Sequence, residues 1–321
     1  MKTISFMLAL LGLAVVTALV AWLGAGAVWD AARAVGWGGF LLLCAAQVPL
    51  FLVLAWSWWV IAPTGGFLAY LWGRMVRDSA GNCLPFTHMG GFVAGVRAMA
   101  LRGVAGSGAT ASTIADVTAE VLAQVVFAAI GLIILVAHVP DTRWAWPVAG
   151  VLAVALPALA GFMLAQRGAG RIFARLSRHI AAEWFTDARQ RADVLAAEFA
   201  LIYGHTLRLA GCVGIHLLGW LGTGVLGWAG LHLLGAEISL LDAIALEGLL
   251  HAVLAVAFFI PGHAGVQEAA YIGLGAAFGV GAEVALAASL LRRARDLAWG
   301  VPVLAVWQWM EWRGAEWRRG G

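Results

Sequence analysis

Residues 258–273 of the chain are FFIPGHAGVQEAAYIG, a pattern that is informative about the architecture. A strongly apolar run stops here at Pro261–Gly262, and His263, Gln267 and Glu268 follow before the sequence becomes apolar again. Proline and glycine interrupt helices, and non-helical backbone is tolerated at membrane depth only where it is buried in protein or lines a cavity. The stretch therefore predicts a broken helix inside a membrane protein, with a carboxylate placed at the break.

The composition of the whole chain agrees with a membrane environment. Hydrophobic residues make up 63% of the 321 residues and charged residues only 12%, and the mean hydropathy is +0.90. Soluble domains have roughly 45–50% apolar and about 25% charged residues. Several apolar runs also exceed the roughly 18 residues that mark a membrane-spanning helix. The fold class that this predicts is all-α, a polytopic bundle of transmembrane helices.

The hydropathy pattern predicts clean membrane spans and two regions broken by proline and glycine, about eight membrane helices in all. The clean spans are residues 4–26, 37–62, 114–138, 144–165, 209–234 and 240–260. The broken regions are residues 66–112 and 261–312. The first apolar run is longer than the roughly 7–15 residues of a secretory signal core, so an uncleaved span is expected, with a cleaved signal as the alternative.

One integral membrane domain is expected, in two halves joined by a basic loop. The expected parts of residues 1–321 are the first half 1–165, the loop 166–208 and the second half 209–321. Arginines in the loop recur on one helical face and predict that it is cytoplasmic, either solvated or lying on anionic headgroups. Because an even number of spans precedes the loop, the N-terminus is expected in the cytoplasm, and Arg313, Arg318 and Arg319 predict the same side for the C-terminus.

The two broken regions resemble each other. Leu84-Pro85 is followed by His88-x-Gly90, and Ile260-Pro261 is followed by His263-x-Gly265. The match is short, and its spacing differs by one residue. Interrupted helices at corresponding positions of two halves point to a binding site at the interface of an internal repeat.

A polar stripe is expected on the span that begins near residue 114. Ser112, Asp116, Glu120 and Gln124 recur every four residues, so they lie along one helical face. A charge at the bilayer centre costs about 2.5–3.5 kcal/mol on the insertion scale, which favours a cavity or a partner for each carboxylate. The alternative is that Asp116 and Glu120 lie in the first turns of the helix, at the interface, where the helix dipole favours them.

Two groups of charges accompany the broken regions. The first group is Arg74, Arg77, Asp78, Asn82, Arg97 and Arg102, and the second is Arg292, Arg293, Arg295 and Asp296. Arg292 and Asp296 are spaced to pair on one face of a helix. Cytoplasmic flanking charges are the alternative for both groups. Glu247 and His251 form a weaker pair, which helix packing explains as well as function does.

Several classes of function lack their signature here. The only lysine is Lys2, so the chain has no P-loop, and no HExxH zinc-protease motif is present. The cysteines are scattered and are expected to be packed thiols. The lone histidines in apolar helices, His138, His216 and His232, are expected to be packed side chains too. The spacing of the polar residues does not bring together a nucleophile, a general base and a third residue that would orient the base. We expect no enzyme activity, no cofactor, no metal site and no nucleic-acid partner.

Two segments of the second half, PGHAGVQEAAY and ALAASLLRRARDLAWGVPVLAVWQ, carry a family resemblance. They resemble the flippase-like membrane family, which includes the transmembrane region of lysylphosphatidylglycerol synthases. The Gly-Val-Gln-Glu form, the Leu-Leu-x-Arg-Ala-Arg-Asp run and the final Trp-Gln resemble its hopanoid-biosynthesis-associated subgroup. The first half agrees at Asn82, Leu84-Pro85, Gly90-Gly91, Arg97, Asp116-Val-Thr-x-Glu120 and Gln124. The resemblance covers about residues 5–312.

The resemblance implies lipid movement rather than lipid synthesis. It implies a bacterial inner membrane, a hopanoid cargo moved towards the outer membrane, and hopanoid-biosynthesis enzymes as partners; for the broader family the implied cargo is a phospholipid. The chain departs from the broader family at His263-Ala264 and at Gln267, which replaces a frequent arginine. It also shows no soluble domain that could transfer an amino acid before Gly321.

The lipid headgroup is expected to bind between the two broken regions, at the restarted helix. The backbone N–H groups of Gly265 and Val266 would suit a phosphate or a hydroxyl-rich headgroup, and Glu268 would pair with Arg97 or Arg295. The candidate residues are Asn82, Pro85, Gly90, Gly91, Arg97, Asp116, Glu120, Pro261, Gly262, Gly265, Gln267, Glu268, Arg292, Arg295 and Asp296. The alternatives are an intramembrane lipid-modifying enzyme with Glu268 as acid or base, and a scaffold that holds enzymes through the basic loop.

Overall fold

The computed structural model describes residues 33–84, 87–138, 186–257 and 265–317, together with Asp30, Trp146, Gly150, Ala153 and His263. The expected span 4–26 lies outside these residues, as do nearly all of the expected span 144–165 and the first twenty residues of the basic loop. Pro85, Pro261 and Gly262 lie outside them too.

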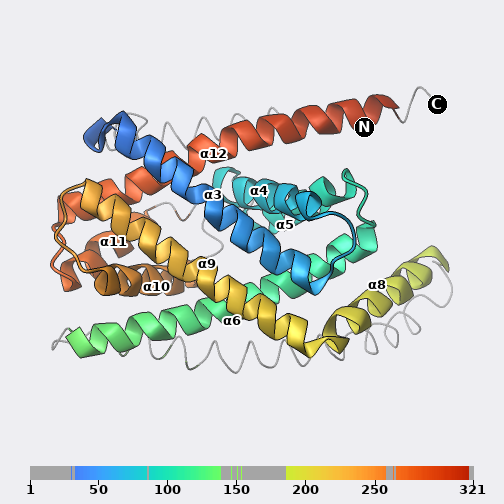
Figure 1. Ribbon diagram of the computed structural model, residues 1–321, viewed down its shortest axis with the longest axis horizontal. Helices are drawn as coiled ribbons and strands as arrows, with labels where there is room; N and C mark the ends of the chain where they lie inside the picture. Colours follow the sequence, from blue (N-terminus) through green and yellow to red (C-terminus); the bar gives the residue numbers. More distant parts are fainter. Residues whose placement is uncertain are drawn as a thin grey trace.

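All regular structure in the described part of the chain is helical, which confirms the predicted fold class (Figure 1). The helices are α3 (Gly36–Ile61), α4 (Phe67–Cys83), α5 (Thr87–Ala100), α6 (Gly106–His138), α8 (Thr186–Gly204), α9 (Thr206–Leu233), α10 (Leu240–Val256), α11 (Val266–Ala277) and α12 (Ala282–Trp317). Among them α3, α6 and α9 are long and apolar enough to cross a membrane. The chain is therefore a helical membrane protein.

Several expected boundaries agree with the helices. The span 37–62 corresponds to α3, 209–234 to α9 and 240–260 to α10. The span expected from residue 114 begins earlier, at Gly106, because the hydroxyls of Thr110 and Thr113 donate to main-chain carbonyls of the preceding turn and need no other partner. Each broken region becomes a short helix beside another helix: α4 with α5, and α11 with α12.

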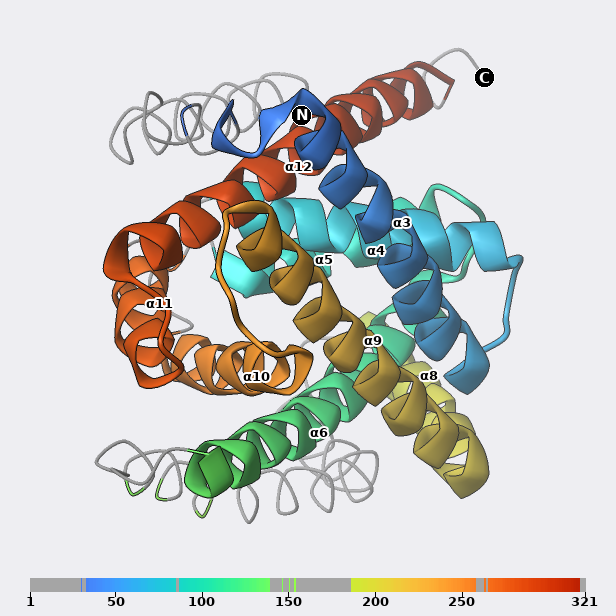
Figure 2. The same ribbon diagram turned by 60° about the vertical axis from the view of Figure 1, so that its left-hand side comes forward.

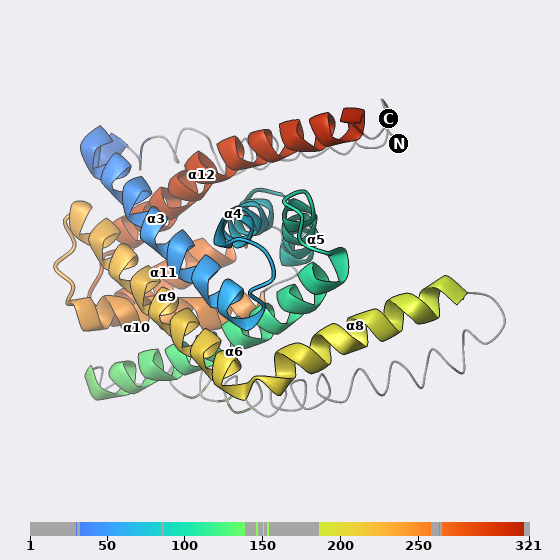
Figure 3. The same cartoon turned by 45° about the vertical axis from the view of Figure 1, so that its right-hand side comes forward.

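The long helices form the framework of the bundle. Figure 2 shows α3 and α9 side by side and antiparallel, with α6 against α10 and α4 against α12. The helix α8 extends along the edge of the bundle and contacts α6 (Figure 3). One apolar core joins α6, α9, α10, α11 and α12, and a second joins α3, α4, α6 and α9.

The two shortest helices of the described part of the chain, α5 and α11, are far too short to cross a bilayer. At about 1.5 Å per residue, the 14 residues of α5 reach about 21 Å and the 12 residues of α11 about 18 Å. The hydrocarbon core of a bilayer is about 30 Å thick. In chain order the helices α3 to α6 have 26, 17, 14 and 33 residues, and α9 to α12 have 28, 17, 12 and 36. The same order of long, short, short and long helices occurs twice.

Polarity is distributed as in a membrane protein, with apolar side chains outside and charges within. Leu41 is 63% exposed and Ile133 is 69% exposed, whereas Arg74, Arg77 and Glu247 are 5% exposed or less. Exposed leucines and isoleucines suit lipid, and interior charges need partners inside the protein. The charged interior is therefore the candidate region for the functional site.

Candidate functional site

The polar stripe on α6 faces the interior of the protein. Asp116 is the eleventh residue of α6 and is completely buried, so the alternative that places it in the first turns is wrong. At the two ends of the stripe, the Ser112 hydroxyl accepts a hydrogen bond from Trp58 Nε1 at 3.2 Å, and Gln124 Nε2 donates to the His251 carbonyl at 3.0 Å. The four-residue period correctly predicted one inward face.

The carboxylates in the middle of this stripe bind the arginines of α4. We call Arg74, Arg77, Asp78, Asp116 and Glu120 the α4–α6 charge cluster. Arg77 Nη1 is 2.6 Å from Asp116 Oδ2, Arg74 Nη2 is 2.6 Å from Glu120 Oε1, and Arg77 also binds Glu120. Arg74 Nε is 2.8 Å from Asp78 Oδ2. Both arginines are interior groups with several partners each, so the interpretation of them as flanking charges is wrong.

Three side chains from α3 and α9 complete the surroundings of Asp116. His216 Nε2 is 2.9 Å from Asp116 Oδ1 and 2.8 Å from the Ser57 hydroxyl, and Cys212 Sγ is 3.9 Å from the same carboxylate oxygen. In a Ser-His-Asp triad, serine and aspartate bind different ring nitrogens. Here both are on Nε2, so these residues are not arranged as a triad.

The ligand atoms of Asp116, Cys212 and His216 all lie within 4.8 Å of one another, so these three could hold a metal ion. The sequence interpretation treated Cys212 and His216 as packed side chains. They are packed, but against a carboxylate. The signal that could have revealed this is their spacing, because residues four apart on α9 lie on one helical face.

A second group of polar side chains lies between α10, α11 and α12. We call Glu247, His251, Tyr271 and Arg292 the α10–α12 cluster. Arg292 Nη1 is 2.7 Å from Glu247 Oε2, and the Tyr271 hydroxyl donates to Glu247 Oε1 at 2.5 Å. Arg292 Nη2 lies 3.0 Å from His251 Nε2. Because a guanidinium can only donate, His251 Nε2 is the acceptor, and its Nδ1–H donates to the Glu247 carbonyl at 2.7 Å.

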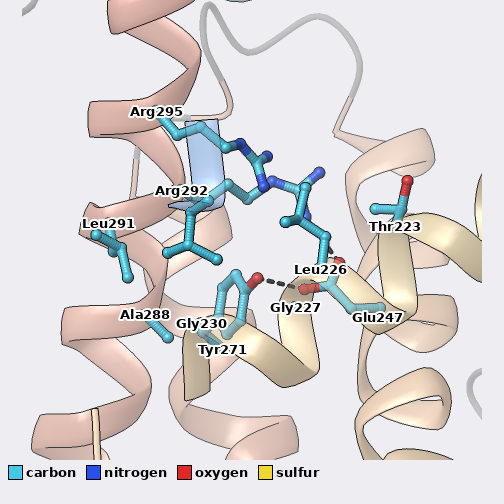
Figure 4. A pocket seen from close by; sticks show the side chains of 11 residues that line it. Thr223, Leu226, Gly227, Gly230, Glu247, Tyr271, Ala288, Leu291, Arg292 and Arg295 are labelled. Carbon is cyan, nitrogen blue, oxygen red and sulfur yellow. Dashed lines mark hydrogen bonds and ion pairs between the residues drawn. The ribbon is translucent and has the colours of Figure 1, made fainter. Parts of the chain in front are cut away.

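A pocket opens at this second cluster (Figure 4). Its empty space, open mouth included, is about 370 Å³. Figure 4 shows Tyr271 bonded to Glu247 on one wall, with Arg292 and Arg295 reaching in from α12. The remaining lining is mostly apolar, from Leu43 of α3 and from α9 and α12.

The charged lining of the pocket is positive on balance. It contains the guanidinium groups of Arg292 and Arg295 but only one carboxylate, that of Glu247. The partner of Arg295 is Asp296, whose Oδ1 is 3.1 Å away and which does not line the pocket. Arginine binds carboxylate and phosphate oxygens through charge-assisted hydrogen bonds. The pocket is therefore suited to an anionic or oxygen-rich group.

Polar and aromatic contacts connect the pocket to the α4–α6 charge cluster. Trp220 Nε1 donates to the Glu120 carbonyl at 3.2 Å, and its ring lies 4.6 Å from that of His251. His251 in turn contacts Arg292, and its carbonyl accepts from Gln124. The two groups of buried charges are thus one continuous region.

Several pairings expected from the sequence are wrong. Glu268 binds Arg293 Nε at 2.6 Å, not Arg97 or Arg295. Arg97 is 2.7 Å from Glu311 near the end of α12. Arg292 of α12 binds Glu247 of α10 and not Asp296 of its own helix. Asp296 binds its neighbour Arg295.

The N-terminus of α11 also has its own partner. The Glu268 side chain accepts a hydrogen bond from the Gly265 N–H at 2.8 Å, which caps the helix. Gly265 has φ +77°, a conformation that glycine adopts without penalty. Next to it, Gln267 is buried and donates to the Ser289 hydroxyl at 3.0 Å. This helix end is held by the chain itself.

The remaining candidates lie away from the pocket lining. Asn82 is exposed near the end of α4, and Gly90 is half-buried. A Cβ at Gly91 would lie 2.5 Å from the Arg77 carbonyl, so this glycine permits the close approach of α5 to α4. Of the predicted site residues that the structure describes, Arg292 and Arg295 alone line the pocket. Glu247 and Tyr271 were not among the predicted site residues, although the sequence predicted a weak pair of Glu247 with His251.

Comparison with known protein families gives a match over most of the chain. The model of the family described as the lysylphosphatidylglycerol synthase TM region matches residues 9–304. No curated protein and no solved structure matches the chain.

Proposed function

Because this chain belongs to the lysylphosphatidylglycerol synthase transmembrane-region family, we propose that it moves a membrane lipid whose headgroup enters the pocket at Glu247 and Arg292. The family is one of lipid synthesis or lipid movement in membranes. Ionisable groups inside a membrane protein are expensive and commonly mark a transport path. The proposal rests on one observation above all, the pocket with two guanidinium groups inside an apolar bundle.

In the proposed binding mode the charged pocket binds the headgroup, and the apolar outer surface contacts the lipid chains. Arg295 and Arg292 would donate to headgroup oxygens, and Glu247 and Tyr271 would keep Arg292 in place. The apolar chains of the lipid would stay in the bilayer, against the exposed leucines of the outer surface. Movement would then require no change in the lipid's covalent structure.

Two cargoes fit this binding mode to different degrees. The two guanidinium groups of the lining favour a phosphate, which supports a phospholipid. The motif resemblance favours a hopanoid, whose hydroxyl groups could bind the same donors. We keep both as cargoes to be tested, with transport from or across a bacterial inner membrane towards the outer membrane. Hopanoid-biosynthesis enzymes are the proposed partners for the second cargo.

We also propose that the bundle is an inverted repeat, with α3–α6 equivalent to α9–α12. The helix lengths agree in order, and α3 runs antiparallel to its equivalent α9 (Figure 2). The charges correspond with reversed sign. Arg74 and Glu247 are each the eighth residue of a short helix, and Asp116 and Arg292 are each the eleventh residue of a long one. Inverted repeats bring broken helices together at a central binding site.

In this proposal α4–α5 and its equivalent α10–α11 enter the membrane without crossing it, and both termini lie in the cytoplasm with the basic loop 166–208. Because the sequence has no nucleotide-binding motif, the energy would come from an ion gradient, a partner or the cargo's own gradient. These parts of the proposal are supported by the short helices and by the arginine distribution.

The test is reconstitution in liposomes with a labelled phospholipid and, separately, a labelled hopanoid. The exchange of each lipid between leaflets is measured, and its mass is checked afterwards. We expect faster exchange of at least one lipid, with its mass unchanged. Arg295→Gln should reduce this exchange strongly, and Arg97→Gln is the matched control, since Arg97 also pairs with one carboxylate but lies outside the pocket.

The outcomes separate the hypotheses. No acceleration of either lipid by folded protein would overturn lipid movement. A changed mass would identify an enzyme instead. Equal loss in the two arginine variants would remove the pocket from the path while leaving transport standing.

A further inference from the structure

Three side chains of types that bind metals meet where α6 packs against α9. The ligand atoms of Asp116, Cys212 and His216 lie within 4.8 Å of one another, and all three side chains are buried. Cys212 and His216 are four residues apart on α9, so they point to one side of the helix. Carboxylate oxygen, thiolate sulfur and imidazole nitrogen are the ligand types of zinc sites. The group therefore has the composition of a zinc site inside the bundle.

The distances between these atoms are close to those around a tetrahedral ion. Bonds of about 2.0–2.3 Å put neighbouring ligand atoms about 3.3–3.6 Å apart. Asp116 Oδ1 lies 2.9 Å from His216 Nε2 and 3.9 Å from Cys212 Sγ. A further oxygen is beside them, since the Ser57 hydroxyl lies 2.8 Å from Nε2 and 3.3 Å from Oδ1. Small movements of these side chains would place their ligand atoms around one ion.

The second oxygen of Asp116 is already held by the protein. Arg77 Nη1 is 2.6 Å from Oδ2, whereas Oδ1 is the oxygen near His216 and Cys212. Metal-binding carboxylates are commonly fixed by a hydrogen bond of this kind. Asp116 can therefore keep its ion pair with Arg77 and bind an ion through Oδ1.

The charges around the site favour a bound cation. The α4–α6 charge cluster holds three carboxylates and two guanidinium groups, which leaves one negative charge in excess. A zinc ion bound through the Cys212 sulfur adds one net positive charge, because the thiol loses its proton on binding. The formal charges of the region then cancel. An uncompensated buried charge is costly, so this balance favours the ion in spite of the two arginines nearby.

We propose that Asp116, Cys212 and His216 bind a zinc ion between α6 and α9. Thiolate and imidazole ligands select zinc over magnesium and calcium, which take oxygen ligands. With Nε2 bound to zinc, the ring hydrogen of His216 is on Nδ1, which has no hydrogen-bond partner in the described part of the chain. Zinc-binding histidines usually have an acceptor there, and its loss weakens binding about 10–100-fold. The ion should therefore exchange and be removable by a chelator.

The site connects the two proposed repeats. The helix α6 ends the first repeat, α3–α6, and α9 begins the second, α9–α12. Transporters built from inverted repeats work by moving one repeat against the other. A zinc ion bound to both α6 and α9 would hold the repeats together and slow lipid movement. This regulatory role rests on the proposed function, whereas the zinc site does not.

The direct test is zinc binding by the full-length protein in detergent, purified through a tag without histidines and treated with a chelator. Zinc is added back, free ions are removed, and the zinc content per chain is measured. We expect one ion per chain. Zinc-edge X-ray absorption of this wild-type sample should show one sulfur at about 2.3 Å and nitrogen or oxygen ligands at about 2.0 Å. This readout needs no variant, so it stands even where a substitution prevents folding.

Substitutions of the ligands then locate the ion. Cys212→Ser and His216→Gln should each weaken zinc binding by at least about 10–100-fold. Cys44→Ser on α3 and His232→Gln on α9 are the matched controls, because they remove the same residue types elsewhere, and both should bind zinc as wild type does. With cobalt(II) in place of zinc, wild type should show the near-ultraviolet absorption of a thiolate–cobalt bond, and Cys212→Ser should not.

Two results would overturn the zinc site. One is folded wild type that binds no zinc, and the other is zinc bound without a sulfur ligand or equally well by Cys212→Ser. Lipid exchange between leaflets with and without zinc then tests the regulatory role, and we expect zinc to slow exchange by wild type but not by Cys212→Ser. Zinc binding without any lipid exchange would refute the proposed function but keep the site; lipid exchange by a protein that binds no zinc would do the reverse.

Discussion

Glu247 on α10 and Arg292 on α12 form a buried ion pair, with 2.7 Å between Glu247 Oε2 and Arg292 Nη1 and only 1% of the Glu247 side chain exposed. The second carboxylate oxygen accepts from Tyr271, and the second guanidinium nitrogen contacts His251. Each charge therefore has its hydrogen bonds satisfied within the protein. This is how the bundle holds a carboxylate where neither water nor lipid could stabilise it.

The first prediction concerns this pair. Glu247→Gln or Arg292→Met alone leaves an uncompensated buried charge and should cost about 3–5 kcal/mol of stability. The double variant removes both charges and should cost clearly less than the sum of the single variants. Unfolding of the purified protein in detergent measures each of these costs. Additive losses would mean that the two side chains are not coupled in the folded protein.

The second prediction compares two arginines that both pair with carboxylates. Arg77 is 5% exposed and binds Asp116 and Glu120, whereas the side chain of Arg97 is 45% exposed and binds Glu311. Arg77→Gln should cost about 3–5 kcal/mol because it leaves two buried carboxylates, Asp116 and Glu120, to share the single guanidinium of Arg74. Arg97→Gln should cost about 0–1 kcal/mol, since exposed pairs contribute little. Similar melting temperatures for the two variants would contradict the burial of the α4–α6 charge cluster.

The third prediction concerns the crossing of α6 and α10. A Cβ at Gly131 would lie 2.8 Å from the Ala245 carbonyl, and one at Gly248 would lie 2.8 Å from the Phe127 carbonyl. Alanine at either position forces the helices apart and should cost about 1–3 kcal/mol. Gly214→Ala is the control, because nothing lies within 4 Å of its Cβ position. It should stabilise α9 by up to about 1 kcal/mol in the same unfolding experiment.

Local patterns predicted the helices and one face of the site. Asp116 and Glu120 were assigned to one inward face because a four-residue period is a local property of the helix. Their partners Arg74 and Arg77 lie about forty residues away along the chain, and only the tertiary arrangement of α4 and α6 brings the long side chains together. Glu247 was not predicted as a site residue, since a single carboxylate in an apolar span forms no periodic pattern that would show which side chain it faces.

The partner of Glu268 illustrates the same limit. Arg293 and Arg295 are two residues apart on α12, so they point about 200° apart around the helix. Only the packing of α11 on α12 decides that Arg293 meets Glu268, while Arg295 reaches the pocket. The sequence offered several arginines for one carboxylate, and the choice among them is tertiary.

The last prediction separates two roles for Gly265. A headgroup bound at its N–H was expected from the sequence, but Glu268 already accepts from this N–H, and Gly265 has φ +77°. Gly265→Ala should therefore strain the backbone and cost about 1–2 kcal/mol. Gly273→Ala, in the same helix and equally free of neighbours, should be neutral or stabilising by up to about 1 kcal/mol.

Lipid exchange measured per folded molecule completes this comparison. We expect Gly265→Ala and Gly273→Ala to exchange lipid at the wild-type rate, because neither residue lines the pocket of Arg292 and Arg295. If Gly265→Ala instead loses exchange while remaining folded, the headgroup contacts the start of α11. In that case Glu268 must release Gly265 when lipid binds, and the capping hydrogen bond is part of the transport cycle.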